Sequence, residues 1–341
     1  MTTDTTVDPA SSLQPAAYTD KTGAFKRKPS QFRDWISSEP NAKFPPELNR
    51  YHLYVSYTCP WAHRTLITRA LKGLTGVISV SIVHWLLDDK GWKFTNSEES
   101  VSFALKNKDS LGTEDHLYGY DRLRQLYFKA EPEYAGRFTV PVLWDKKLQT
   151  IVNNESSEII RMLSNEFNAF IPKQFAEINI YPVSLQPRIN ELNELIYENI
   201  NNGVYKSGFA IQQDPYDEAV TTLFEHLDKV EEIFKQNHNK GEHFLIGGQL
   251  TEADIRLYVT IVRFDLVYHQ HFKCNLKMIR YDYPHIDQWL RYLYWKVPGF
   301  EETTELELIK TSYTTSHTQI NPYGITPKGP LPLILPYDSS L

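Results

Sequence analysis

The 341-residue sequence has few cysteines, no long apolar run and no excess of basic residues. Its two cysteines, Cys59 and Cys274, are far apart in the chain, which argues against a disulfide scaffold and favours a reducing compartment. No apolar run approaches the roughly 20 residues that a membrane span requires. The formal net charge of -6 argues against a nucleic-acid binder, which needs a basic face, and against docking on an anionic membrane.

Recognisable targeting signals are also lacking at both ends of the sequence. The first residues, from Met1 to Asp4, have neither the basic start nor the apolar stretch of a signal peptide. At the other end, Ser340 stands where the peroxisomal address Ser-Lys-Leu has its lysine. We therefore expect a cytoplasmic protein. Its 41% of hydrophobic and 23% of charged residues are typical of a folded globular chain, and its length fits two domains.

The first structural pattern in the sequence alternates strands and helices. Aromatic and branched side chains at period two predict a strand over 51–57, and a second strand is predicted over 77–83. Between them, apolar residues at helical spacing follow Cys59 and Pro60, so this segment predicts the strand–helix–strand unit of a parallel pair. Further on, the pattern predicts a strand over 138–145 interrupted by Pro141, a return strand over 150–152, and a helix from Ser156.

Composition divides the rest of the chain. Residues 1–48 are polar and proline-rich and predict an extended arm, with at most a short helical turn near 32–36. The polar stretch 88–119 predicts a loop insertion. From about residue 185 the apolar spacing is helical, and Thr251 with Asp254 nearly matches a capping box. The sequence thus predicts an arm (1–48), an α/β domain (49–165), an all-helical domain (166–310) and an irregular tail (311–341).

Cys59 is the candidate with the clearest chemistry. It stands where a strand passes into a helix, and Pro60 suits the first helical position. A sulfur at this place faces the unpaired N–H groups and the positive end of the helix dipole, which favour the reactive thiolate. His63 and Arg64, one turn further on, are candidates to add positive charge. The alternative is that Cys59 is an inert, buried cysteine.

The thiol partner of Cys59 must come from outside the motif. A Cys-x-x-Cys redox pair would have its second thiol at position 62, where this sequence has Ala62. If Cys59 forms a mixed disulfide, an external thiol must resolve it, and glutathione is the abundant one in a reducing cell. No Cys/His cluster has the spacing of a metal site, so no metal is expected.

Two further landmarks fit a glutathione site. The first is Val140-Pro141, which interrupts the segment predicted as a strand. In a thioredoxin-like fold, a cis-proline before a strand exposes the backbone of the preceding residue to a bound thiol peptide. The plainer interpretation is a proline in an edge strand. Glu155 and Ser156 stand at the start of a predicted helix, where Ser156 is a candidate cap. That helix N-terminus suits the carboxylate of a γ-glutamyl group, and Glu155 suits its ammonium; a plain cap with a solvated glutamate is the alternative.

At this point the chain resembles a known family, the glutathionyl-hydroquinone reductases, or xi-class glutathione transferases, which are close to the omega class. The active-site segment Cys59-Pro60-Trp61-Ala62-His63-Arg64 carries the resemblance. Further matches in order are Gly91-Trp92-Lys93-Phe94 and the segments 136–145, 152–162, 201–210, 250–257, 262–265, 271–274 and 313–322. The resemblance covers residues from about 25 to 330, with departures at Phe138, at Ser312 and in the stretch 84–87.

The resemblance implies an α/β + all-α fold, an N-terminal thioredoxin-like domain followed by an all-helical glutathione-transferase domain, in a homodimer. It implies removal of glutathione from glutathionyl-hydroquinones through Cys59. Tyr205 matches the family's proton donor or acceptor, and Tyr268 and Tyr313 match tyrosines that help the cysteine ionise. The positions that match glutathione contacts are Trp92, Arg137, Phe138, Thr139, Val140, Glu155 and Ser156.

Two other functions stay open at this stage. One is an omega-like thioltransferase or dehydroascorbate reductase that uses the same Cys59. The other is a glutathione-binding protein without turnover. Cys274 is interpreted as a buried structural thiol.

Overall fold

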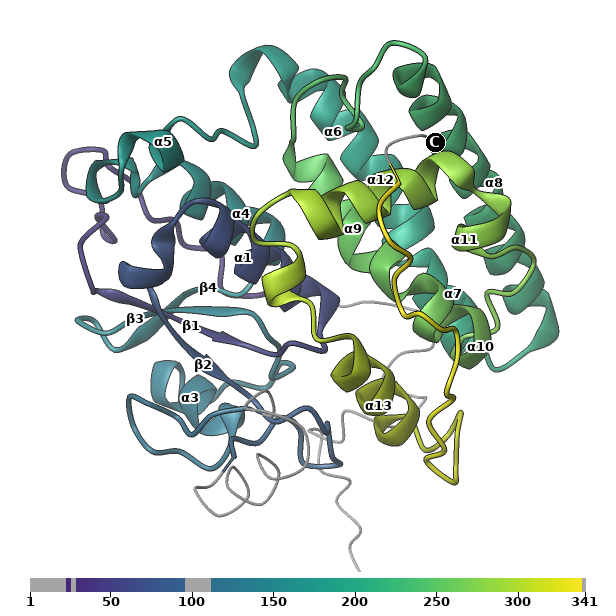
Figure 1. Cartoon of the computed structure of the whole chain (residues 1–341). Helices are drawn as coiled ribbons and strands as arrows, with labels where there is room; N and C mark the ends of the chain where they lie inside the picture. The colour runs from purple at the N-terminus through teal and green to yellow at the C-terminus, as the bar shows by residue number, and fades with distance from the viewer. Residues whose placement is uncertain (1–22, 26–28, 96–111, 339–341) are drawn as a thin grey trace, which may run out of the picture.

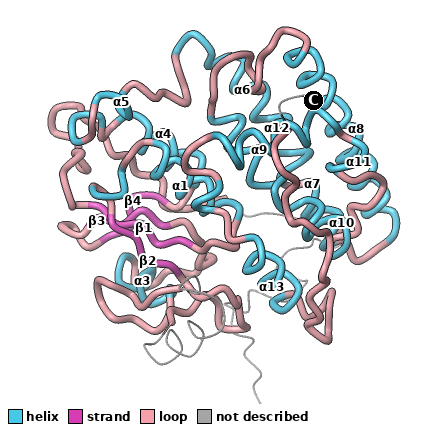
Figure 2. The backbone as a smooth tube through the Cα atoms, viewed as in Figure 1, coloured by secondary structure: helices cyan, strands magenta, loops and turns pink. Residues whose placement is uncertain are grey.

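The computed structural model describes residues 23–25, 29–95 and 112–338 (Figure 1). Most of the arm before residue 29, much of the predicted insertion and the final three residues lie outside the described residues. A small sheet with its helices occupies one side of the molecule, and a larger group of helices occupies the other (Figure 2). In the part of the chain that the structure describes, no helix is long and apolar enough to cross a membrane.

The sheet has four strands, β1 (Tyr51–Val55), β2 (Ser79–Ile82), β3 (Val142–Asp145) and β4 (Thr150–Asn153), in the order β2-β1-β3-β4. β1 pairs with β2 in parallel, whereas β3 pairs antiparallel with both β1 and β4. Helix α1 (Pro60–Leu71) makes the connection from β1 to β2. The predicted strand–helix–strand unit and the return strand are therefore confirmed, and β3 begins directly after Pro141 rather than running through it.

Helices cover both faces of the sheet. α1 packs against α4 (Ser156–Asn165) on one face, and α3 (Leu123–Ala130) lies on the other (Figure 1). The sequence analysis did not anticipate α3, whose Leu123, Leu126 and Tyr127 are buried against the sheet side of the molecule. The core of this part is built around Leu53 and Trp144, which have no exposed surface.

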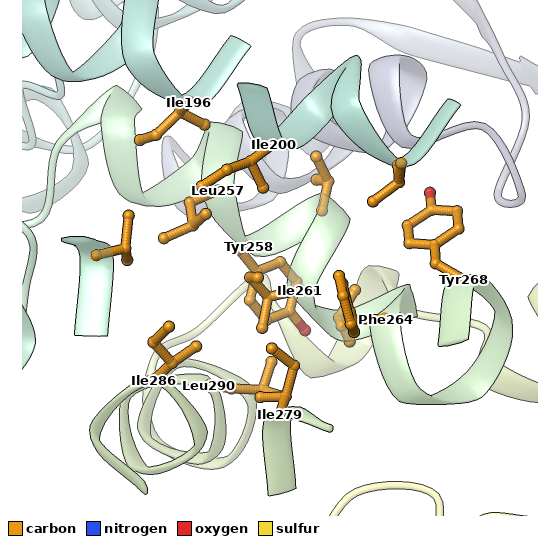
Figure 3. Packing of buried hydrophobic residues seen from close by; sticks show 14 of the residues in the cluster. Ile196, Ile200, Leu257, Tyr258, Ile261, Phe264, Tyr268, Ile279, Ile286 and Leu290 are labelled. Carbon is orange, nitrogen blue, oxygen red and sulfur yellow. The ribbon is translucent and has the colours of Figure 1, made fainter. Parts of the chain in front are cut away.

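The helical part is built around α9 (Glu252–Arg263), of which every residue is buried. Leu257, Tyr258 and Ile261 of α9 pack against the surrounding helices (Figure 3). The other α-helices are α5 (Lys173–Ala176), α6 (Gln186–Ile196), α7 (Gly203–Phe209), α8 (Gln213–His238), α10 (His269–His271), α11 (Ile279–Asp282), α12 (Pro284–Lys296) and α13 (Leu306–Ser316). Two π-helical turns, Tyr197–Asn201 and Phe264–Tyr268, precede α7 and α10, and short 3₁₀ turns occur at Leu74–Gly76, Asn168–Phe170, Val183–Leu185 and Glu301–Thr303.

The start of α9 confirms the predicted cap. Both the backbone N–H and the hydroxyl of Thr251 donate to Asp254, at 3.0 and 3.2 Å. The other carboxylate oxygen of Asp254 accepts from the backbone N–H of Leu245 and the indole of Trp289. This buried carboxylate thus accepts from four donors, two of which belong to the N-cap residue Thr251.

Two expectations need correction. The described part of the arm is extended, as predicted, but it contains no helical turn near 32–36, since Arg33 forms a bridge with Asn153 and Ile36 with Phe44. The irregular tail begins after Ser316 rather than at residue 311, because α13 continues through the buried Tyr313. Runs of threonine and serine beside Tyr313 conceal this helical spacing in the sequence. The division of the chain into domains stays a prediction.

Candidate active site

A cavity of about 540 Å³ lies where the sheet side meets the helical side. All but one of the predicted site residues line it: Cys59, Trp92, Arg137, Phe138, Thr139, Val140, Glu155, Ser156, Tyr205 and Tyr313. The exception is Tyr268, which has no exposed surface and lies behind Tyr313. Residues that are far apart in the sequence therefore share one concave surface, which is the usual form of a small-molecule site.

Cys59 is the N-cap residue of α1, with Pro60 at the first helical position, as predicted. Its thiol is partly exposed to the cavity and lies 3.6 Å from the carbonyl oxygen of Val140. The unpaired N–H groups of the first turn of α1 lie at this end of the helix and favour a negative sulfur. By contrast, Cys274 is fully buried, and burial raises the pKa of its thiol to about 12.

His63 and Arg64 were both expected to add positive charge near Cys59, but only Arg64 is charged at neutral pH. His63 accepts a hydrogen bond at Nδ1 from Arg263, and its Nε2 bonds Thr303. Burial, together with the charge of Arg263, holds the pKa of His63 well below its usual value, so this ring is neutral. Arg64 is also buried, which lowers its pKa to about 9, so its side chain stays charged at neutral pH. We therefore correct the expectation for His63 and keep it for Arg64.

Arg64 connects the two helix N-termini that border the cavity. Its guanidinium lies on the ring of Trp61 in the first turn of α1, 4.5 Å from the ring centroid. It also donates to the hydroxyl of Ser156 at 3.4 Å and to Asn201 at 2.7 Å. A buried cation is thus held between the cysteine helix and the start of α4, where its charge favours anions at both places.

The segment before β3 lines the cavity. The Val140-Pro141 bond is cis. The carbonyl oxygen and the N–H of Thr139 both bond the hydroxyl of Tyr127, at 2.8 and 3.2 Å. The ring of Phe138 packs against Tyr127 and Phe128, which accounts for a large aromatic residue at this position.

Tyr127 is a positioning residue that the sequence analysis missed. Its hydroxyl donates to the carbonyl of Thr139 and also accepts from the side-chain amide of Asn154, at 3.1 Å. One hydroxyl on α3 therefore holds both the segment before the cis-proline and the turn between β4 and α4. A tyrosine in an unrecognised helix carries no sequence signal that would set it apart from the other 20.

Glu155, rather than Ser156, caps α4. Its side chain accepts from the backbone N–H and the hydroxyl of Ser157, and Ser30 donates to its other oxygen at 3.1 Å. The predicted cap at Ser156 is wrong by one residue, because Ser156 already belongs to the helix and its hydroxyl accepts from Arg64. Two polar side chains thus stand at the start of α4, with a carboxylate that faces the cavity.

The N-terminal arm forms one wall of the cavity, which the sequence analysis did not predict. Ser30 reaches Glu155, and Arg33 forms an ion pair with Glu158 on α4. At the other end of the described arm, Phe25 stacks on Tyr205 with 6.1 Å between the ring centroids. The described parts of the arm therefore line the cavity on its helical side at Phe25 and on its sheet side at Ser30 and Arg33.

Three tyrosines meet at the helical side of the cavity. The hydroxyl of Tyr205 on α7 lies 2.6 Å from that of Tyr313 on α13, which lies 3.1 Å from that of Tyr268. Burial raises the pKa of both Tyr268 and Tyr313 well above the usual value, so both are neutral phenols. Among the described residues, the hydroxyls of Tyr268 and Tyr313 bond tyrosines rather than the sulfur of Cys59. Of the three, Tyr205 and Tyr313 are open to the cavity.

The loop between β2 and α3 docks on α13 beside the tyrosines. The hydroxyl of Ser312 donates to the backbone oxygen of Trp85, and that of Ser316 accepts from the backbone N–H of Leu87. Trp92, further along the same connection, accepts a hydrogen bond at its backbone oxygen from the backbone N–H of Leu123 at the start of α3. In the described part of the chain, no group of three acidic, histidine or cysteine side chains is arranged to hold a metal ion.

Comparisons with known proteins agree with this geometry. The model of the glutathione S-transferase N-terminal domain matches residues 58–166, and that of the C-terminal domain matches 213–291. The chain is 54% identical to glutathione S-transferase omega-like 2 of Schizosaccharomyces pombe over 92% of this chain and 96% of that one. It is 48% identical to glutathionyl-hydroquinone reductase YqjG of Escherichia coli over 90% of this chain and 89% of that one.

Solved structures give the same result. The xi glutathione transferase of Phanerochaete chrysosporium superposes with a TM-score of 0.86 at 52% identity, covering 94% of this chain and 97% of that one. The xi glutathione transferase ECM4 of Saccharomyces cerevisiae, in complex with glutathione, superposes with a TM-score of 0.87 at 49% identity, covering 92% and 99%. The fold is that of a glutathione transferase. The chain belongs to the omega-like, xi-class branch of that enzyme family.

Proposed function

We propose that this enzyme removes glutathione from glutathionyl-hydroquinones, with Cys59 as nucleophile and a second glutathione as reductant. The observation that carries the proposal is the position of Cys59, partly exposed at the N-terminus of α1 and without a second thiol in the motif. The relatives named as glutathionyl-hydroquinone reductases support the substrate class.

The reaction has two thiol steps. The thiolate of Cys59 attacks the sulfur of the conjugate, which forms the Cys59–glutathione disulfide and breaks the bond between that sulfur and the ring carbon. The ring leaves with the electron pair of this bond, and its carbon takes a proton to become the free hydroquinone. A second glutathione thiolate then attacks the mixed disulfide, releases oxidised glutathione and restores the Cys59 thiolate. The ring is reduced by two electrons, and the sulfur of the conjugate and the thiol of one free glutathione become the disulfide of oxidised glutathione.

Tyr205 is the proposed source of the proton. Its hydroxyl faces the same cavity as Cys59, and its bond with Tyr313 fixes the direction of the phenol. A positioned proton donor of this kind contributes about 10²–10⁴-fold to a rate. Tyr313 and Tyr268, which stay neutral, orient Tyr205 in this scheme.

Glutathione is proposed to lie along the sheet side of the cavity. The backbone around Val140 suits the extended peptide, and Glu155 suits the ammonium of the γ-glutamyl group. The carboxylate of that group fits the start of α4 near Ser156, where the charge of Arg64 adds to the helix dipole. Trp92, Arg137, Phe138 and Thr139 border the same region. A cytoplasmic homodimer is part of the proposal.

The test compares two substrates in the presence of glutathione. We expect rapid release of hydroquinone from glutathionyl-hydroquinone, faster than the reduction of a simple glutathione mixed disulfide. A strong preference for the mixed disulfide would instead support the alternative function, an omega-like thioltransferase or dehydroascorbate reductase. Binding of glutathione with no turnover of either substrate would support a binding protein.

A further inference from the structure

A histidine at the end of α13 forms part of the cavity that the proposed mechanism does not use. His317 directly follows Ser316, the last residue of α13, and its side chain lines the cavity. Its ring contacts both Phe209 and Phe272, at centroid distances of 5.2 and 5.7 Å, and lies 5.4 Å from Tyr313. The surrounding rings fix the orientation of this imidazole beside the tyrosine cluster.

One nitrogen of His317 is committed to a second histidine. The Nδ1 atom of His317 lies 3.0 Å from the Nε2 atom of His271, which is almost fully buried behind it. Burial lowers the pKa of His271 to about 4 and that of His317 to about 3. Both rings are therefore neutral near pH 7, and one of them donates the single proton that their hydrogen bond needs.

The other nitrogen of His317, Nε2, has no hydrogen-bond partner among the described residues. In a neutral imidazole pair this atom is an acceptor if His317 donates at Nδ1, and a donor if His317 accepts there. The walls next to it are aromatic, since Phe209 packs on His317 and Phe25 stacks on Phe209. An uncharged polar atom thus stands beside aromatic side chains that line the cavity.

We propose that Nε2 of His317, as the hydrogen-bond acceptor that results when His317 donates at Nδ1 to His271, binds a ring hydroxyl of the aromatic substrate and so selects hydroxylated rings over the corresponding ring ethers. This inference rests on the proposed function, because it names the substrate feature that the same site recognises. A neutral nitrogen suits a neutral phenol, whereas an anionic ring substituent would find no positive charge on this imidazole. The flat rings of Phe25 and Phe209 suit the faces of the substrate ring.

The experiment measures binding without turnover. In the Cys59→Ser background, the dissociation constants of glutathionyl-hydroquinone and of its dimethyl ether are measured by calorimetry. Three further variants in that background are compared: His317→Phe, which keeps a ring but removes the nitrogen; His317→Gln, which restores a hydrogen-bond acceptor in its amide oxygen; and His269→Gln as a matched control on α10. His269 does not line the cavity.

We expect His317→Phe to weaken binding of the hydroxylated conjugate about tenfold, the size of one neutral hydrogen bond, and to leave the ether unchanged. His317→Gln is expected to recover most of the loss, and His269→Gln to change neither constant. Equal weakening of both ligands, or of neither, by His317→Phe would overturn the inference. Loss of the native fold in that variant moves the decision to His317→Gln, which must still prefer the hydroxylated ring.

Turnover of glutathionyl-hydroquinone by the unmodified enzyme separates this inference from the proposed function. If the enzyme turns the conjugate over but His317→Phe does not discriminate between the two ligands, only the inference fails. If the enzyme does not turn it over while His317→Phe does discriminate, the proposed reaction fails and the hydroxyl-binding role stands.

Discussion

The hydroxyl of Tyr205 lies 2.6 Å from the hydroxyl of Tyr313, although the two residues are 108 positions apart in the chain. Tyr313 in turn bonds Tyr268, which is fully buried. Because Tyr313 has one proton, it can donate to only one of these two hydroxyls, and the other must donate to it. The proposed proton donor, Tyr205, is therefore hydrogen-bonded to Tyr313 on α13, which is in turn hydrogen-bonded to the buried Tyr268.

The first prediction concerns this row of hydroxyls. Tyr205→Phe is expected to lower kcat for glutathionyl-hydroquinone about 100-fold, because the ring carbon loses its proton donor. Tyr313→Phe is expected to lower it less, about tenfold, since Tyr205 keeps its hydroxyl and loses only its orientation.

A second substrate is the control for the tyrosines. When Cys59 reduces a glutathione mixed disulfide, the leaving group is a thiolate and not a ring carbon. This reaction therefore needs no protonation of a ring carbon. We expect both variants to reduce it at nearly the normal rate, as measured by oxidised glutathione formed. An equal loss with both substrates would contradict the role of Tyr205 as proton donor.

The second prediction concerns the hydroxyl of Tyr127. Tyr127→Phe leaves the N–H and carbonyl of Thr139 and the amide of Asn154 without their shared partner. We expect the KM for glutathione to rise about tenfold while kcat changes little, because the variant loosens the binding surface and not the nucleophile. Tyr118→Phe, whose hydroxyl bonds Trp144 away from the cavity, is the matched control. An unchanged KM in Tyr127→Phe would show that the hydroxyl does not position this surface.

The third prediction concerns the close approach of α7 to Phe272. A Cβ atom at Gly208 would lie 2.2 Å from the Phe272 ring, which also contacts Tyr205 and Tyr268. Gly208→Ala is expected to destabilise the fold by about 1–3 kcal/mol in urea unfolding, since the ring must move.

Gly203 on the same helix supplies the control for Gly208. A Cβ there would meet Leu223 at 3.4 Å, an ordinary contact. Gly203→Ala is expected to be neutral or slightly stabilising, because alanine favours the helix. Similar effects of the two substitutions would contradict the packing argument.

The fourth prediction concerns the pH dependence of stability. Burial lowers the pKa of His52 to about 3 and that of His63 well below its usual value, and His271 and His317 are lowered to about 4 and 3. Below about pH 6.5 the unfolded chain takes up protons at these positions and the folded chain does not. Stability is therefore expected to fall as the pH is lowered from 6.5 towards 4, by up to about 1.4 kcal/mol per pH unit for each ring.

One variant isolates a single ring in that measurement. His52 lies between the hydroxyls of Ser79 and Ser81, outside the cavity. His52→Gln is expected to reduce the slope of unfolding free energy against pH between 6 and 5 by about 1.4 kcal/mol per unit. An equal slope in the variant and the parent would show that the pKa of His52 is the same in the folded and the unfolded chain, which would contradict this prediction.

The sequence analysis predicted local structure well and the assembly of the site only in part. β1, α1 and β2 follow from periodicity, and the position of Cys59 at the start of α1 follows from its proline. These features depend on neighbouring residues, so a pattern within a short window contains them.

The missed features depend on contacts between distant segments. Phe25 and Ser30 of the arm reach the cavity, and Tyr127 joins two turns, through packing that no local pattern encodes. His63 was expected to be charged because its neighbours in sequence gave no sign of burial or of the bond from Arg263. The three tyrosines came from the family resemblance alone, since 21 tyrosines of similar context occur in the chain.

The most direct test of the account follows the release of hydroquinone from glutathionyl-hydroquinone in the presence of glutathione, with Cys59→Ala and Cys274→Ala beside the unmodified enzyme. Cys274 is buried with a raised pKa, so its loss removes a thiol that takes no part in the reaction. The account predicts rapid turnover by the enzyme and by Cys274→Ala, and none above background by Cys59→Ala. Turnover that survives in Cys59→Ala, or is absent from the unmodified enzyme, would contradict it.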